Sequence, residues 1–203
     1  MGSEEWLDQI FDFTVERQEI LRRAGKSYYP MEQTGIGVLH TTEGPTIEGA
    51  FATLHHDFSA PHFIAGENRI IQCRPIGVQA AALHAPANNR AYVQIEMVGF
   101  CSTDPWIPED STLQPTVAIM AYAARHWGIP LRAPNDWVDD LSDCPRLATN
   151  NPRRMLAAEG LWDTEQGWWF HLETPHQAPT WHHDPGALRR TELLAMADAV
   201  LCR

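Results

Sequence analysis

Three segments of the chain each place a side chain that can bind a metal ion at the end of an apolar run or in a sharp turn. They are His40 in GVLHTTEG, His171 in GWWFHLETP and Asp184 in HHDPG. A catalytic zinc site has three protein ligands with nitrogen, oxygen or sulfur donors and keeps its fourth position for water. Two imidazoles and one carboxylate meet this requirement, so these residues form a candidate metal site.

Each of these residues also fits an ordinary structural role when it is considered alone. A histidine after a strand is commonly a polar loop residue, and an aspartate before Pro-Gly commonly forms a turn through its side chain. The second ligand has an alternative in His176. His171 is favoured because it belongs to a predicted strand, whereas His176 does not directly follow one.

The apolar runs predict the strands and helices that would position these side chains. Strands are predicted at 35–40, 62–65, 69–73, 91–98 and 168–172, and a turn at 66–68 joins the second and third as a hairpin. Helices are predicted at 46–56, 112–127, 152–159 and 188–201, and a long loop at 133–153. This mixture predicts an α/β domain with one mixed β-sheet flanked by helices.

An extra helix is predicted at the N-terminus, over residues 4–24. Trp6, Ile10, Phe13 and Ile20 recur at roughly helical spacing, and Gly25 would end the helix. The chain is therefore divided into an N-terminal helical arm, residues 1–30, and a main domain, residues 31–203.

Composition and charge exclude several classes of protein. The 203 residues are 44% hydrophobic and 20% charged, as in soluble globular proteins. The net charge of −11 argues against a nucleic-acid-binding protein and against attachment to an anionic membrane. No apolar run approaches the roughly 20 residues of a transmembrane helix. The acidic N-terminus lacks the features of a signal peptide, so synthesis in the cytoplasm is expected.

Four segments taken together resemble the type 2 N-acetylmuramoyl-L-alanine amidases. They are GVLHTTEG, PHFIAGENRIIQCRPIGVQAAALHA, NNRAYVQIEMVGF and GWWFHLETP with the following HHDPGAL. That family includes phage endolysin domains, and its fold is shared with peptidoglycan recognition proteins. The resemblance implies that residues 31–203 form a zinc amidase domain, with peptidoglycan or soluble muropeptides as substrate. The bond cut would be the amide between N-acetylmuramic acid and the L-alanine of the stem peptide.

The resemblance also implies a role for each matching residue. His40, His171 and Asp184 correspond to the zinc ligands. Glu96, in IEMVG, matches a strand glutamate that acts in some members as the general base for the attacking water. His182 lies two residues before Asp184, where the family carries a Lys or His that can stabilise the developing oxyanion.

Two further positions bear on substrate binding and on the base. His84, in LHAP, matches a histidine that lines the substrate cleft of the family. Many members have a catalytic Tyr before the His-Phe of the hairpin, but this chain has Pro61 there. Members without the Tyr tend to rely on the strand glutamate, so the base role is assigned to Glu96.

Alternatives to a lytic amidase remain at this point. A peptidoglycan-binding module of the same fold would lack catalysis, but such modules typically lose a zinc ligand, and all three ligand positions are filled here. A different hydrolase could use the same metal ligands on an unrelated fold. An endolysin, an antibacterial effector and a wall-recycling enzyme all fit as biological roles. A lytic, endolysin-like enzyme of phage or bacterial origin that acts on the bacterial cell wall is favoured.

Overall fold

The computed structural model describes residues 4–20, 29–83, 85–101, 109–134, 160–175, 184–185 and 188–203. The helix predicted at 152–159 and most of the loop predicted at 133–153 lie outside these residues. No helix in the described part of the chain is both long and apolar enough to cross a membrane.

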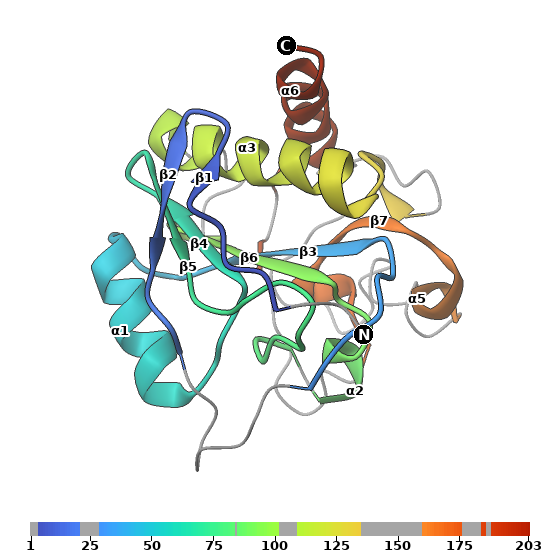
Figure 1. Ribbon diagram of the computed structural model, residues 1–203, viewed down its shortest axis with the longest axis horizontal. Helices are drawn as coiled ribbons and strands as arrows, with labels where there is room; N and C mark the ends of the chain where they lie inside the picture. Colours follow the sequence, from blue (N-terminus) through green and yellow to red (C-terminus); the bar gives the residue numbers. More distant parts are fainter. Residues whose placement is uncertain are drawn as a thin grey trace.

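The predicted mixed sheet forms the centre of the fold, and it has seven strands, two more than predicted (Figure 1). Its strands are β1 (Gln9–Ile10), β2 (Phe13–Arg17), β3 (Ile36–Thr41), β4 (Phe63–Gly66), β5 (Arg69–Gln72), β6 (Val93–Met97) and β7 (Gly167–Phe170). They lie in the order β1-β2-β5-β4-β6-β3-β7. The β1–β2 and β4–β5 pairs are antiparallel and the others are parallel, so the predicted hairpin is confirmed.

Helices cover both faces of this sheet (Figure 1). They are α1 (Ile47–Asp57), α2 (Ala85–Asn88), α3 (Asp110–Trp127), α5 (Leu161–Thr164) and α6 (Arg190–Leu201). The predicted helices at 46–56, 112–127 and 188–201 correspond to α1, α3 and α6. Helix α3 ends at Gly128, whose φ of 64° is a left-handed conformation that glycine adopts without strain.

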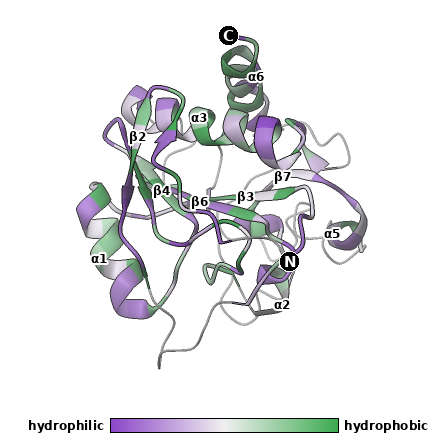
Figure 2. Ribbon diagram, viewed as in Figure 1, coloured by the Kyte–Doolittle hydropathy of each residue, from purple (hydrophilic) through white to green (hydrophobic). Residues whose placement is uncertain are grey.

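Alternate strand residues supply separate cores on the two faces, as the pleat of a strand requires. Phe63 of β4 packs in the cluster that contains residues of α3, whereas the adjacent Ile64 packs in the cluster that contains Ile47 of α1. Figure 2 shows hydrophobic and hydrophilic residues mixed along α1, while α6 is mainly hydrophobic. Strands β3 to β7 are buried along almost their whole length, which explains why their sequences are largely apolar, whereas β1 and β2 at the edge are partly exposed.

The predicted N-terminal helix is wrong, because this segment forms the strands β1 and β2. The buried apolar residues in the described part of this segment are Leu7, Ile10, Val15 and Ile20, and these four positions are spread around a helix instead of forming one helical face. The backbone turns at Phe11, with φ of 48°, and β2 then pairs in parallel with the edge of β5. Hydrogen bonding to the otherwise unpaired backbone groups of the β5 edge stabilises the strand more than the amphipathic pattern stabilises a helix.

Candidate metal centre

His40 and Glu96 lie side by side on one face of the sheet. They are direct partners in the parallel β3–β6 register. Their neighbours Leu39 and Ile95 point the other way and belong to the core beneath α3. Because successive side chains of a strand alternate between faces, His40 and Glu96 both lie on the face opposite α3.

His171 and Asp184 reach His40 from the other side. Strand β7 runs parallel to β3 with Phe170 opposite Leu39, so His171 lies next to His40 where β7 gives way to the 3₁₀ turn η4 (His171–Glu173). The backbone oxygen of Asp184 accepts a hydrogen bond from the Leu172 N–H at 3.0 Å. Its side-chain Oδ2 accepts one from the Thr41 N–H at 3.4 Å.

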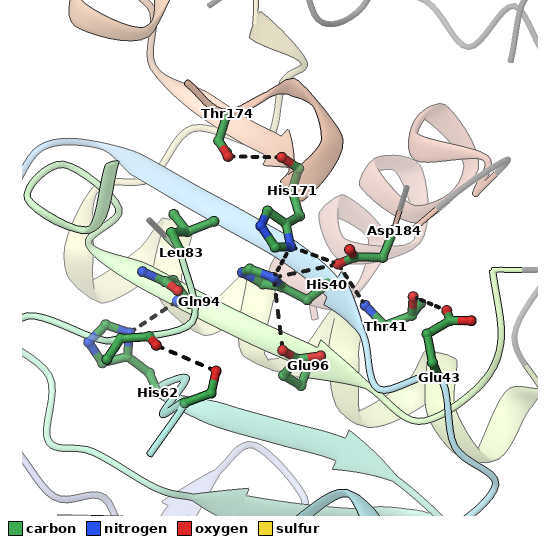
Figure 3. Close-up of polar contacts among 12 residues, drawn as sticks. His40, Thr41, Glu43, His62, Leu83, Gln94, Glu96, His171, Thr174 and Asp184 are labelled. Carbon is green, nitrogen blue, oxygen red and sulfur yellow. Dashed lines mark hydrogen bonds and ion pairs between the residues drawn. The ribbon is translucent and has the colours of Figure 1, made fainter. Parts of the chain in front are cut away.

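The three predicted ligands converge on one point (Figure 3). The distance between the Nδ1 atoms of His40 and His171 is 3.0 Å. Asp184 Oδ2 lies 3.1 Å from the Nδ1 of His171 and 3.6 Å from that of His40. All three residues are buried, and their donor atoms fall within 4.8 Å of one another.

This arrangement fits a tetrahedral metal ion. With zinc–ligand bonds of about 2.0–2.1 Å, neighbouring ligand atoms of a tetrahedron lie about 3.3 Å apart. The three observed separations of 3.0, 3.1 and 3.6 Å bracket that value. Two nitrogen donors and one carboxylate oxygen also match the chemistry of a zinc site, so His40, His171 and Asp184 could hold a metal ion.

Comparison with known families agrees with this geometry. Residues 32–186 match the family described as N-acetylmuramoyl-L-alanine amidase. The chain belongs to this family. The matched region contains all three candidate ligands, which identifies them as part of the amidase domain rather than of an unrelated addition.

Solved structures of amidases share the fold. The endolysine N-acetylmuramoyl-L-alanine amidase LysCS from Clostridium intestinale is 11% identical, with a TM-score of 0.59 over 91% of this chain and 95% of that one. The Staphylococcus aureus hydrolase AmiA is 15% identical, with a TM-score of 0.58 over 98% of this chain and 93% of that one. No curated protein matches the sequence. At these identities the likeness concerns the fold alone.

Glu96 lies at the edge of the ligand cluster of the amidase domain. Its Oε1 is 3.9 Å from His40 Nδ1, and its buried Oε2 has no hydrogen-bond partner among the residues that the structure describes. Burial raises the pKa of Glu96 well above its usual range, and the negative charges of Asp184 and Glu43 add to this effect. A divalent cation at the ligands would act in the opposite direction, because it favours the ionised carboxylate.

A loop beside the cluster is fixed by the carboxylate of Glu43. Its Oε1 accepts hydrogen bonds from the Thr41 hydroxyl and from the Cys101 N–H, both at 2.8 Å. Glu43 itself is exposed and has a left-handed backbone, with φ of 50°. These contacts join the loop after β3 to the loop after β6, so both strand ends that carry site residues are held together.

His62 is a supporting residue for which no role is predicted from the sequence. Its Nδ1 accepts the Gln94 N–H at 3.1 Å (Figure 3). Its Nε2–H donates to the Val78 oxygen at 3.0 Å. Burial lowers the pKa of His62 to about 4, which keeps the ring neutral at physiological pH. The His62 ring, just before β4, therefore hydrogen-bonds to β6 at Gln94, two residues before Glu96.

Three residues considered for the site lie outside the described part of the chain. They are His84, His182 and the alternative ligand His176. The roles assigned to His84 and His182 by resemblance therefore stay predictions.

Proposed function

We propose that this protein is a zinc-dependent amidase that hydrolyses the bond between N-acetylmuramic acid and the L-alanine of the peptidoglycan stem peptide. The observation that carries the proposal is the convergence of His40, His171 and Asp184 in a buried cluster within an amidase-family domain. A peptidoglycan-binding module has no need for a complete set of ligands at tetrahedral spacing.

Amide hydrolysis needs a polarised carbonyl, an activated water and a route for one proton. A zinc ion held by the three ligands would polarise the carbonyl and lower the pKa of the attacking water. Glu96 lies beside the ligands, 3.9 Å from His40 Nδ1, where its carboxylate can accept a proton and pass it to the leaving nitrogen. In this scheme His182 donates to the oxyanion and His84 contacts the substrate.

The proposed biological role is lysis of the bacterial cell wall. Support comes from the endolysine LysCS, which spans almost the whole of this chain with the same fold. The proposal therefore names polymeric peptidoglycan as the substrate and an endolysin-like enzyme as the class.

Metal analysis of variants tests the zinc site. We expect one zinc per wild-type chain and loss of zinc in His171→Ala and Asp184→Asn, because each variant leaves two ligands. His56→Gln is a matched control, since this histidine lies on the exposed side of α1 and should leave zinc content unchanged. Full zinc content in His171→Ala would remove His171 from the ligand set, and absence of zinc from the wild type would refute the proposed function.

A further inference from the structure

A buried ion pair lies behind the metal ligands. Glu173 and Arg190 are both fully buried, and the Nη2 of Arg190 donates to the Oε1 of Glu173. Glu173 follows His171 by two residues, and Arg190 follows Asp184 by six. The pair thus connects the two chain segments that bring ligands to His40.

The Glu173 carboxylate fixes the turn that carries His171. Its Oε2 accepts the Phe170 N–H at 2.8 Å while Oε1 binds Arg190. The backbone oxygen of His171 accepts two bonds from Thr174, from the N–H at 3.0 Å and from the hydroxyl at 2.8 Å. The change from strand to 3₁₀ turn at His171, which sets the direction of its ring, is therefore held by side-chain contacts.

Arg190 anchors the segment that carries Asp184. Its guanidinium lies 4.0 Å from the centre of the Phe170 ring, so it contacts β7 as well as Glu173. The backbone N–H of Arg190 donates to the backbone oxygen of Leu188 at 3.0 Å. At the other end of the segment, the backbone oxygen of Asp184 accepts the Leu172 N–H at 3.0 Å. Both ends of this segment are thus tied to the strand and turn beside His171.

Stability alone is a weak reason for two charges at this position. Removing a carboxylate and a guanidinium from water is costly, and apolar residues of similar size often replace a buried ion pair without loss of stability. Leu188 and Leu193, on either side of Arg190, pack in the main core, so an apolar residue would suit this environment. The ion pair differs from an apolar contact in its directed hydrogen bonds, which specify one geometry.

We propose that Glu173 and Arg190 are positioning residues that set the spacing of His171 and Asp184 for the metal ion. Both side chains are fully buried, so neither contacts substrate, and they act through the two ligands. This inference rests on the proposed zinc site. Glu173 and Arg190 would then contribute to the metal affinity although neither binds the metal ion.

The test separates metal affinity from folding by removing both charges together. In Glu173→Gln/Arg190→Met, no charge is left unpaired, and the amide can still accept the Phe170 N–H. The stability of the metal-free protein, measured by urea unfolding, should lie closer to wild type than in either single variant. The zinc affinity, measured by competition with a chelator, should be about tenfold weaker or worse, and the absorption spectrum of the cobalt-substituted site should change.

A second variant and a control keep the test decisive. Arg190→Lys keeps the positive charge but loses the planar guanidinium over Phe170, and should also weaken zinc binding. Glu16→Gln removes the carboxylate of another Glu–Arg pair, Glu16 with Arg69, which lies at the partly exposed edge of the sheet and should not affect zinc. Zinc affinity and cobalt spectrum unchanged in the double variant and in Arg190→Lys would overturn this inference alone. A wild-type protein without zinc affinity would overturn the proposed function as well.

Discussion

The neutral, buried His62 makes folding stability depend on pH. The pKa of His62 falls from 6.5 to about 4 on folding because burial disfavours the imidazolium. Between these values the unfolded chain binds a proton at this ring and the folded chain does not. The stability from this residue is therefore fully present above pH 6.5 and is lost as the pH falls toward 4.

The size of the effect follows from the two pKa values. The loss of unfolding free energy is about 1.4 kcal/mol by pH 5.5 and about 3 kcal/mol by pH 4. Gln at position 62 has no proton to gain and can still hydrogen bond. The His62→Gln variant should thus be less stable than wild type at pH 7.5. Between pH 7.5 and 5.5, however, its free energy of unfolding should fall by about 1.4 kcal/mol less than that of wild type.

Urea unfolding of the metal-free proteins in the presence of a chelator measures this difference. Acid also affects the other titrating groups, but these are shared by both proteins and cancel in the comparison. His56→Gln is the control, because this side chain is 88% exposed on α1 and its loss should leave the wild-type pH dependence intact. Equal losses in wild type and His62→Gln between pH 7.5 and 5.5 would refute the assignment of a neutral buried ring.

Two further predictions concern the base and the N-terminal segment. Glu96→Gln should keep one zinc per chain and lower kcat by about 10²–10⁴-fold, because the amide cannot accept the proton of the attacking water; activity within a few-fold of wild type, measured by release of soluble muropeptides, would exclude Glu96 as the base. Deletion of residues 1–20 should markedly lower the melting temperature, because it removes buried Ile10, Val15 and Ile20 and uncovers β5. A truncated protein that melts at the wild-type temperature would show that β1 and β2 are dispensable.

The ligand cluster was predictable because its residue types are distinctive. His40, His171 and Asp184 stand in segments whose order resembles a known family. The parallel register of β3 and β7 brings His40 and His171 together, and the hydrogen bonds from the Leu172 and Thr41 N–H groups hold Asp184 beside them. The position of Glu96 beside His40 was predictable for the same reason. The strands and main helices were predictable because their apolar runs are long and end at clear turn residues.

Other features depend on contacts that no local pattern encodes. The segment over residues 4–24 has an amphipathic pattern, but in its described part, residues 4–20, the edge of β5 and the side chain of Gln72 determine the structure. The Gln72 side chain accepts the Leu7 N–H at 2.8 Å and donates to the Glu5 backbone oxygen at 2.9 Å. It therefore hydrogen-bonds backbone groups that a neighbouring strand would otherwise pair. The position of residues 1–30 as a separate arm stays a prediction, although β2 is hydrogen-bonded into the main sheet.

The ion pair of Glu173 and Arg190 shows the same limit. In the sequence, Arg190 is one of two adjacent arginines before an amphipathic helix, a pattern typical of solvent-exposed charge. In the structure the side chain of Arg190 is fully buried against Glu173 and Phe170, whereas that of Arg189 is partly exposed and pairs with Glu192. The tertiary contacts of the two side chains, and not their local sequence, distinguish the two arginines.

The measurement that tests the central claim most directly is mass spectrometry of the products from purified peptidoglycan. The zinc-loaded protein should release stem peptides with a free L-alanine amino terminus and leave intact N-acetylmuramic acid on the glycan. Activity should disappear with a chelator and return with added zinc. Products with a new sugar reducing end, or with a cut inside the peptide, would contradict the assigned bond, and no products at all would contradict an enzymatic role.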